Sequence, residues 1–382
     1  MVYIVTVPET AYLFLRGQFR VLQTNGYEIC LISSPGPKLD AIERELAIKT
    51  YPIEIKREIS LVSDLISLLR IFIIMRELKP TVVNYSTPKA GLLGAIAAWL
   101  AHIPIRIYEL RGLRLETVVG LRRFILASSE RITSYCSTYV VCVSKSLLSI
   151  YKTMKLARPD KVIVFRKGTH YSASPSAILN QHANPAVAET LSRNLNIAEG
   201  AKVIGYVGRL TRDKGIEDLF KCFLDVVSHE PKSILLIVGK IERGDPLPTG
   251  MIERIRDHPD VRLIGEVEDV APYYQIMDVF AFPSYREGLP NAPLEAALAG
   301  VPTVGYGATG VVDAVVDGET GILIQIGCVN KLTEGILRLL KDDNLRRSFG
   351  KNAREYVLSE FSTESARLAW LQFYEQCLSR LP

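Results

Sequence analysis

The feature that most constrains this chain is a regular alternation of short apolar runs, typical of strands, with longer patterns typical of helices. One helical pattern, Leu61–Leu78, repeats its Leu and Ile residues at spacings of three and four. Strands that alternate with helices form βαβ units around a parallel sheet. In the first half of the chain, strands are predicted at Tyr3–Val7, Tyr27–Ile32, Thr81–Tyr85, Ile105–Tyr108, Tyr139–Val143 and Val162–Phe165.

The alternation restarts after a stretch from His170 to Pro185, which is rich in Ser, Ala, Asn, Gln and Pro and which we interpret as an interdomain linker. We therefore predict an α/β protein of two Rossmann-like domains, residues 1–180 and 190–362. They would face each other across a cleft that takes a ligand at the carboxyl ends of the strands. In the second half, strands are predicted at Val203–Val207, Ile234–Val238, Val261–Ile264, Val279–Phe282, Thr303–Tyr306 and Ile322–Ile324.

The composition excludes several classes of protein. The chain has 382 residues, of which 48% are hydrophobic and 23% are charged, as in an ordinary globular protein. Its six cysteines form no C-x-x-C pair, so we expect neither a zinc site nor a redox motif. The first residues read as a strand and not as a signal peptide, and no run reaches the ~18 apolar residues of a spanning helix. We expect a cytoplasmic protein.

The charge is divided unevenly between the two halves. Residues 1–180 contain 24 Lys and Arg against 13 Asp and Glu, a net charge of +11, whereas residues 181–382 contain 22 against 28, a net charge of −6. A basic half favours an anionic partner, which could be an acidic lipid surface, a diphosphate-linked acceptor or a nucleic acid.

The segment from Phe282 to Gly300 carries the clearest functional pattern. A strand ends at Phe282, Asn291 is placed to cap a following helix, Pro293 fits its first turn, and Gly300 ends it. The loop would bring the amides and the positive dipole end of that helix to the ligand edge of the sheet. Such a helix start is a ready site for a diphosphate.

Two carboxylates, Glu287 and Glu295, bracket this helix start. Glu295 could accept hydrogen bonds from the vicinal hydroxyls of a ribose, and Glu287 could bind hydroxyls of a sugar beyond the diphosphate. The alternative is that both are solvated acids near a helix start.

A second segment places two cations after another strand. Gly208 follows the strand at Val203–Val207 and lets the backbone approach a ligand, and Arg209 comes next. Lys214 then precedes Gly215, which opens a helix. Two cations at one site suit a leaving diphosphate, although either one alone would read as a surface residue.

Together these segments resemble the retaining GT-B glycosyltransferases of glycosyltransferase family 4. The motif from Gly208 to Gly215 is similar to the phosphate-binding element of that family, and Glu287 to Glu295 matches its E-x7-E motif. Further matches lie at residues 278–284, 299–302 and 318–323. Segments at residues 86–94 and 111–116 resemble a bacterial subgroup that builds capsule, O-antigen and lipid-linked glycans.

The resemblance implies a role for each matching residue. Arg209 and Lys214 would bind the donor diphosphate, Glu287 the donor sugar, and Glu295 the ribose. The reaction would retain the configuration of the sugar without metal or cofactor, and we find no D-x-D motif. Donor contacts would also come from Gly208, from Val267 in the loop that receives the base, and from the backbone of Gly288, Leu289, Asn291 and Ala292.

The first half departs from the family at one position. Arg111 stands where many members have a His that helps to hold the donor sugar, so that Arg111 could instead face a phosphate. The resemblance also implies that the helix within residues 363–382 packs back on the first domain. The spacing of its apolar residues alone does not decide this, because it also fits a terminal helix of the second domain.

The resemblance further implies a donor and an acceptor. We expect a UDP-linked hexose or N-acetylhexosamine as donor, and a lipid-diphosphate-linked or glycan acceptor. Peripheral contact with the inner face of the cell membrane would come from the basic first domain, with a solvated basic helix face as the alternative. The residues that suggest this contact are Arg106, Arg111, Arg114, Arg122, Arg123 and Arg131 with Leu113, Leu115, Leu121, Phe124 and Leu126.

Other functions fit the sequence less well. A GT-B-fold epimerase would need acid–base groups in the cleft, and none of the five histidines lies in a shared motif. A dinucleotide-dependent oxidoreductase would need G-x-G-x-x-G after the first strand, where the chain has Pro8-Glu-Thr-Ala-Tyr12. A non-catalytic scaffold is disfavoured because Arg209, Lys214 and Glu287 are all present, and no aromatic-rich basic motif indicates nucleic-acid binding.

Overall fold

The computed structural model describes residues 1–56, 60–169, 185–242 and 244–381. The chain divides into two compact units, Met1–Ala173 with Thr363–Pro382, and Ser174–Ser362. Of the linker predicted from His170 to Pro185, residues 170–184 lie outside the described residues, and Pro185 begins a helix. Within the described ranges, no helix is long and apolar enough to cross a membrane.

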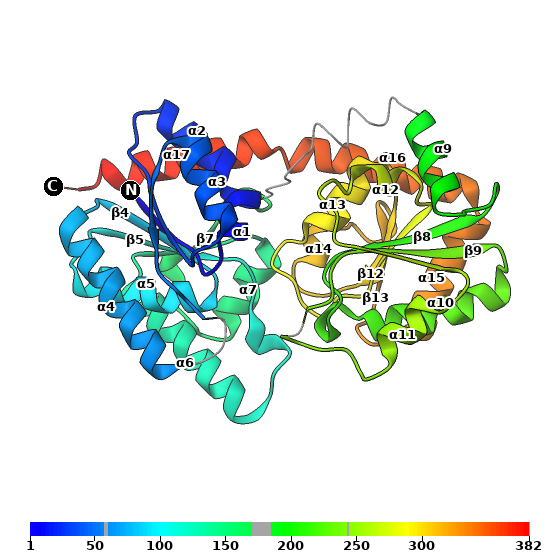
Figure 1. Cartoon of the computed structure of the whole chain (residues 1–382), viewed down its shortest axis with the longest axis horizontal. Helices are drawn as coiled ribbons and strands as arrows, with labels where there is room; N and C mark the ends of the chain where they lie inside the picture. The colour runs from blue at the N-terminus through cyan, green and yellow to red at the C-terminus, as the bar shows by residue number, and fades with distance from the viewer. Residues whose placement is uncertain (57–59, 170–184, 243, 382) are drawn as a thin grey trace. The chain divides into compact units, whose positions relative to one another are not determined.

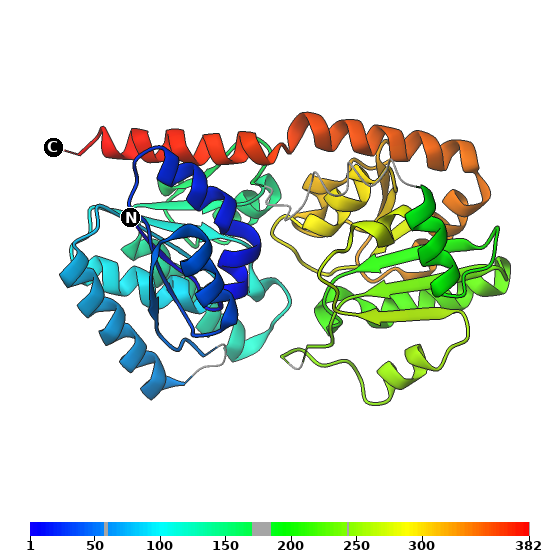
Figure 2. The same ribbon diagram turned by 45° about the horizontal axis from the view of Figure 1, so that its top comes forward.

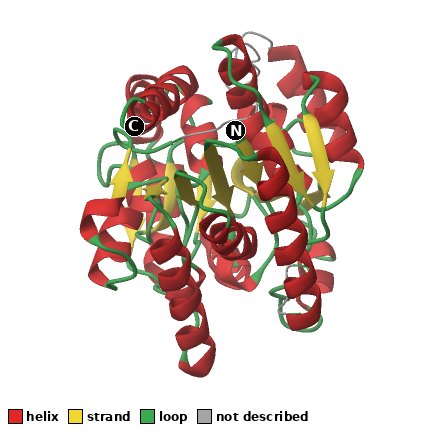
Figure 3. Ribbon diagram, turned by 90° about the vertical axis from the view of Figure 1, so that its left-hand side faces the viewer, coloured by secondary structure: helices red, strands yellow, loops and turns green. Residues whose placement is uncertain are grey.

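The first unit is built on a sheet whose neighbouring strands all run parallel, in the order β3-β2-β1-β4-β5-β6-β7 among the described residues. In Figure 3 these strands lie between layers of helices. The strands are β1 (Val2–Ile4), β2 (Cys30–Ser33), β3 (Lys49–Pro52), β4 (Val82–Ser86), β5 (Ile105–Leu110), β6 (Tyr139–Cys142) and β7 (Val162–Val164).

Helices cover both faces of this sheet (Figures 1 and 2). One face carries α1 (Pro8–Thr10), a π-helical turn (Ala11–Leu15), α2 (Arg16–Thr24), α3 (Pro37–Leu46) and α17 (Thr363–Leu378). The other carries α4 (Leu61–Leu78), α5 (Pro88–Leu100), α6 (Gly120–Cys136) and α7 (Lys145–Thr153), with short 3-10 turns at Arg114–Glu116 and Pro159–Lys161.

The last helix, α17, belongs to the core of the first unit. Trp370 and Tyr374 are buried there, and Trp370 packs against Phe165 with ring centroids 5.0 Å apart. The hydroxyl of Tyr374 accepts a hydrogen bond from Asn84 at 2.8 Å and shares a second with the hydroxyl of Tyr3 at 2.8 Å. Side chains from the N-terminal and C-terminal parts of the chain therefore pack into one core.

The second unit has a parallel sheet in the order β10-β9-β8-β11-β12-β13 over the part of the chain described here. Its strands are β8 (Lys202–Val207), β9 (Ser233–Val238), β10 (Val261–Gly265), β11 (Val279–Phe282), β12 (Thr303–Tyr306) and β13 (Gly321–Ile324). Its helices are α9 (Pro185–Asn194), α10 (Ile216–His229), α11 (Met251–Arg256), α12 (Ala271–Gln275), α13 (Asn291–Leu298), α14 (Val311–Ala314), α15 (Val329–Lys341) and α16 (Asp343–Glu360), with a 3-10 turn at Arg212–Lys214.

The structure confirms the predicted strands to within a few residues and shows one that the sequence analysis missed. β3 (Lys49–Pro52) is a half-exposed edge strand, so it lacks the apolar run by which the buried strands were found. The chain is therefore an α/β protein with two Rossmann-like domains, each with strand order 3-2-1-4-5-6 at its core.

The basic cluster expected on the surface of the first unit is only partly on the surface. Leu113 and Leu115, in the segment that leads from β5 to α6, are buried. Arg106 turns inward and donates hydrogen bonds to the carbonyls of Ile103 and Cys136, the latter at 2.6 Å. The prediction that these three side chains form a membrane-facing surface is therefore wrong.

Tyr374→Phe should lower the free energy of unfolding by about 1–3 kcal/mol, because it leaves Asn84 and Tyr3 with one fewer buried partner. Tyr139→Phe is the matched control, since the hydroxyl of Tyr139 bonds Arg380 at an exposed site. Urea unfolding of both variants checks this. Equal losses would contradict the assignment of α17 to this core.

Candidate active site

Two strand-to-helix loops diverge at the centre of the second sheet. β8 and β11 are neighbours, but the strands connected to β8 lie on one side and those connected to β11 on the other. Such a topological switch point leaves a crevice at the carboxyl ends of the strands, where ligands bind in doubly wound sheets. The loop after β8 carries Gly208 to Gly215, and the loop after β11 spans residues 283–290.

An ion pair joins the two loops. Nζ of Lys214 lies 2.5 Å from Oε1 of Glu287, and the two side chains are only 12% and 13% exposed. The hydroxyl of Ser284 donates to the same carboxylate oxygen at 2.8 Å. The amide of Glu287 donates to the carbonyl of Thr309 at 3.1 Å, so a third loop supports this residue. The structure thus brings together two of the predicted site residues from segments 73 positions apart.

A second ion pair, one residue away on each loop, reinforces the first. Arg286 donates to Oδ2 of Asp213 at 2.6 Å, and the hydroxyl of Thr211 donates to Oδ1 at 2.6 Å. Burial alone would raise the pKa of Asp213, but the Thr211 hydroxyl and the Arg286 charge lower it overall. The amide of Tyr285 also donates to the carbonyl of Asp213 at 2.9 Å. These contacts fix the relative position of Lys214 and Glu287.

Arg209 lies on the more exposed side of the same edge. Its guanidinium forms an ion pair with Glu242, from the segment after β9, and is 48% exposed. Burial alone would lower the pKa of Arg209, but Glu242 raises it overall, with further contributions from Asp213 and Glu287. Arg209 is therefore held as a cation at this edge of the sheet.

Glu295 lies on α13, one turn beyond the loop. The buried hydroxyl of Tyr274, on α12, donates to its Oε2 at 3.1 Å. Burial and the adjacent carboxylate hold the pKa of Tyr274 well above its ordinary value. The phenol therefore stays a donor, and it orients a carboxylate that is itself only half-buried.

The start of α13 differs from the prediction. Pro290 is the N-cap, with extended backbone angles of −75° and 125°, and Asn291 is the first helical residue. A proline suits this position because the cap residue is extended and needs no amide hydrogen within the helix. The prediction that Asn291 caps the helix is therefore wrong, whereas Gly300, with φ of +75°, follows the helix end as predicted.

The remaining predicted residues lie on three separate elements. Gly288 and Leu289 are in the loop before α13, and Ala292 is in its first turn. Val267 follows β10 and is half-buried against the core of the second unit. Arg111 belongs to the first unit, where it follows β5 and lies 3.0 Å from the buried carboxylate of Glu109.

The sequence analysis missed the residues that hold this arrangement. Asp213 and Arg286 lie inside the segments described above, but each is the other's partner across two loops, which spacing along the chain cannot reveal. Ser284 lies in the same loop as its partner Glu287, three residues before it. Tyr274 lies outside those segments, and no signal in the sequence pointed to it.

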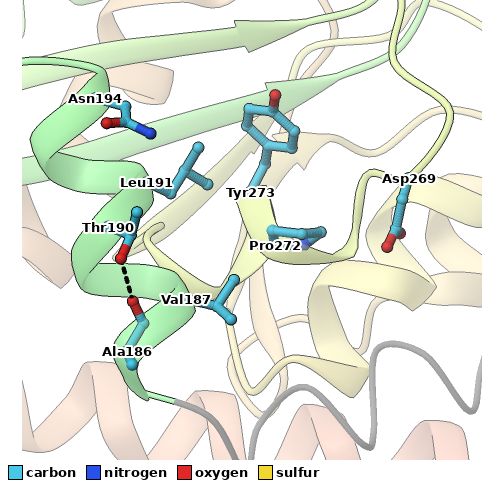
Figure 4. A pocket seen from close by; sticks show the side chains of 8 residues that line it. All are labelled: Ala186, Val187, Thr190, Leu191, Asn194, Asp269, Pro272 and Tyr273. Carbon is cyan, nitrogen blue, oxygen red and sulfur yellow. Dashed lines mark hydrogen bonds between the residues drawn. The ribbon is translucent and has the colours of Figure 1, made fainter.

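A recess elsewhere in the second unit contains none of the predicted residues. It lies between α9 and α12 (Figure 4). Its lining residues are Ala186, Val187, Thr190, Leu191, Asn194, Asp269, Pro272 and Tyr273. It gathers no convergent charges of the kind present at the switch point, so we assign it no role.

Comparisons with known proteins identify the family of the chain. Residues 187–356 match the family described as glycosyl transferases group 1, and residues 3–144 match the family described as glycosyl transferase 4-like. The capsular polysaccharide biosynthesis glycosyltransferase CapM of Staphylococcus aureus is 37% identical over 95% of this chain and 93% of its own.

Two further similarities cover most of the chain. An Escherichia coli protein named UDP-Gal:alpha-D-GlcNAc-diphosphoundecaprenol alpha-1,3-galactosyltransferase is 24% identical over 90% of this chain and 88% of its own. The crystal structure of Anabaena HepE with UDP and glucose has a TM-score of 0.77 and 18% identity, covering 100% of this chain and 99% of that one. The latter likeness shows the GT-B fold.

Gly215→Ala should be more destabilising than Gly250→Ala. Both glycines have left-handed backbones, with φ of +70° and +75°. A Cβ at Gly250 meets nothing within 4 Å, so only backbone strain of about 1–2 kcal/mol is expected. A Cβ at Gly215 would clash with the carbonyl oxygen of Pro283, in the opposite loop, and should add about 1–3 kcal/mol.

Urea unfolding of the two glycine variants measures this difference. Equal losses of stability would mean that the loops after β8 and β11 do not pack as closely as described.

Proposed function

The chain belongs to the group 1 glycosyl transferases, and on that premise we propose that it transfers a hexose or N-acetylhexosamine from a UDP-linked donor to a lipid-diphosphate-linked or glycan acceptor. The proposed process is the synthesis of a bacterial surface polysaccharide. The observation that carries the proposal is the Lys214–Glu287 ion pair at the switch point of the second sheet, directly before the start of α13.

The two cations would bind the donor diphosphate. Lys214 is largely buried and oriented by Glu287, whereas Arg209 is half-exposed and paired with Glu242. Charge placed in advance where a leaving group becomes more negative lowers the barrier without reorganisation during the reaction. Because Arg209 and Lys214 supply two positive charges, we propose that the reaction needs neither a metal nor another cofactor.

The carboxylates would bind hydroxyls. Glu295, oriented by Tyr274, would accept hydrogen bonds from the two ribose hydroxyls, a task for which a carboxylate has enough acceptor sites. Glu287 would bind the donor sugar, and Ser284 would keep its carboxylate in place. Gly208, the backbone of Gly288 to Ala292 and the loop at Val267 would complete the donor site.

The proposed reaction retains the configuration of the donor sugar. The bond between the anomeric carbon and the diphosphate oxygen breaks, the acceptor oxygen bonds to the same face, and the leaving phosphate takes the proton of the acceptor hydroxyl. Catalysis would then come from positioning and from stabilisation of the leaving group.

The proposals for donor and acceptor are supported by two of the similar proteins. The name of the Escherichia coli enzyme includes UDP-Gal and a diphosphoundecaprenol-linked sugar, and HepE was solved with UDP. Arg111 is proposed to contact a phosphate or the donor sugar, and the buried carboxylate of Glu109 would orient its guanidinium.

Lys214→Ala should slow sugar transfer by a factor on the order of 10² or more, because it removes a charge from the leaving group. Lys221→Ala is the matched control, since Lys221 is an exposed lysine on α10 that pairs with its helix neighbour Glu217. Single-turnover transfer from a UDP-sugar to a lipid-diphosphate-linked acceptor measures the effect. Normal turnover of Lys214→Ala would remove this assignment.

A calorimetric panel of UDP, GDP, ADP, CMP and dTDP, with and without magnesium, tests the donor. UDP should bind most tightly and independently of magnesium, and Glu295→Ala should weaken that binding by about tenfold or more. Glu253→Ala, which removes an exposed carboxylate on α11, should leave it unchanged. A preference for GDP would overturn the proposed donor, and binding to no nucleotide would overturn the proposed function.

A further inference from the structure

Asp218, in the first turn of α10, binds two tyrosines with one oxygen atom. Its Oδ2 accepts a hydrogen bond from the hydroxyl of Tyr285 at 2.6 Å and another from the hydroxyl of Tyr306 at 2.7 Å. The two rings pack edge to face, with centroids 5.5 Å apart. A single carboxylate oxygen therefore holds together two phenols that lie far from Asp218, and from each other, in the sequence.

The Asp218 cluster, which consists of Asp218, Tyr285 and Tyr306, joins three segments of the second unit. Asp218 belongs to the start of α10, and Tyr285 lies in the loop after β11. Tyr306 is the last residue of β12 and directly precedes the loop at residues 307–310. The cluster therefore ties the start of one helix to two of the loops at the carboxyl edge of the sheet.

The same three segments already meet at Glu287. This residue lies in the loop after β11 and pairs with Lys214, which directly precedes the start of α10. Its amide donates to the carbonyl of Thr309, in the loop after β12, at 3.1 Å. The Asp218 cluster is thus a second junction of the segments that form the candidate site. Two junctions restrict sliding and rotation of these segments in a way that one junction cannot.

The three segments are also packed backbone against backbone. A Cβ added at Gly215 would clash with the carbonyl oxygen of Pro283, between the start of α10 and the loop after β11. A Cβ added at Gly310 would clash with the carbonyl oxygen of Gly288, between the loops after β12 and β11. Because close-packed segments transmit strain, a displacement at the Asp218 cluster would reach Lys214 and Glu287.

The two phenols are well suited to hold this carboxylate. Tyr306 is buried and Tyr285 is half-buried. Burial raises the pKa of both hydroxyls well above the ordinary value, and the hydrogen bond to Asp218 raises it further. Both therefore remain protonated donors. Hydrogen bonds from a hydroxyl to a carboxylate are short and stronger than those between neutral groups, and one carboxylate oxygen has room for two donors.

We propose that Asp218 is a positioning residue of the transferase. Through Tyr285 and Tyr306 it holds the loop after β11 and the end of β12 against α10. This keeps Lys214 and Glu287 at the spacing that a donor diphosphate and its sugar require. The inference deepens the proposed function and rests on it. A small misplacement of groups that stabilise a transition state costs more in the chemical step than in binding of the substrate.

Asp218→Ala should lower kcat for sugar transfer on the order of tenfold or more, because it releases both phenols at once. KM for the UDP-linked donor should change less than kcat. The rate is expressed per UDP-binding site, and the number of sites is measured by calorimetry. A loss of folded protein would reduce the number of sites and not the rate at each site.

Glu217→Ala is the matched control for this variant. It removes a carboxylate from the same first turn of α10, where Glu217 pairs with Lys221, so both variants lose the same favourable interaction with the helix dipole. Because Glu217 does not belong to the Asp218 cluster, its removal should leave kcat per site within about twofold of the unchanged protein.

A milder series tests the same contacts without removing the side chain of Asp218. Asp218→Asn should recover most of the rate lost in Asp218→Ala, because the amide oxygen can accept from both phenols. Tyr285→Phe and Tyr306→Phe should each lose part of the rate. In the variant that lacks both hydroxyls, Asp218→Ala should lower kcat per site by no more than about a further twofold, since the contacts act as one unit.

Four results would overturn the inference while the proposed function stands. They are an unchanged kcat per site in Asp218→Ala, an equal loss in Glu217→Ala, no recovery in Asp218→Asn, and a loss that appears only as fewer UDP-binding sites. The last result would make Asp218 a residue of the fold alone. If the unchanged protein binds no UDP or transfers no sugar, the proposed function fails, and this inference fails with it.

Discussion

The ion pair between Lys214 and Glu287 is the contact on which the proposed chemistry depends. Both side chains are largely buried, and an uncompensated charge at such a depth would be unstable. Each charge therefore compensates the other in this buried position before any ligand is bound. The Asp213–Arg286 pair beside it fixes the spacing of the two loops. The site is in this sense ordered in advance, as electrostatic stabilisation of a leaving group requires.

Most of the fold was predictable because buried parallel strands read as apolar runs. This was sufficient for β11 and β12, whose predicted bounds match those in the structure. It failed for the edge strand β3, which is only half-covered. The spacing of apolar residues in α17 could not show which unit the helix packs on. The partners of Tyr374 are Tyr3 and Asn84, some 290 or more residues away in the sequence.

The candidate site was predictable as a set of residues but not as a set of contacts. The sequence motifs identified Arg209, Lys214, Glu287 and Glu295. The structure shows which residue each of them contacts. Spacing could not show that Arg209 pairs with Glu242, 33 positions away, or that Tyr274 orients Glu295.

The most direct measurement is a calorimetric cycle that compares UDP with UMP, in the unchanged protein and in Lys214→Ala. If Lys214 holds the second phosphate, UDP should bind the unchanged protein at least tenfold more tightly than UMP, because a charged hydrogen bond contributes about 1.5–3 kcal/mol. Most of that advantage should be lost in Lys214→Ala, while UMP affinity changes little. An equal loss for both nucleotides, or an undiminished preference for UDP, would contradict the central claim that the loops after β8 and β11 bind a diphosphate.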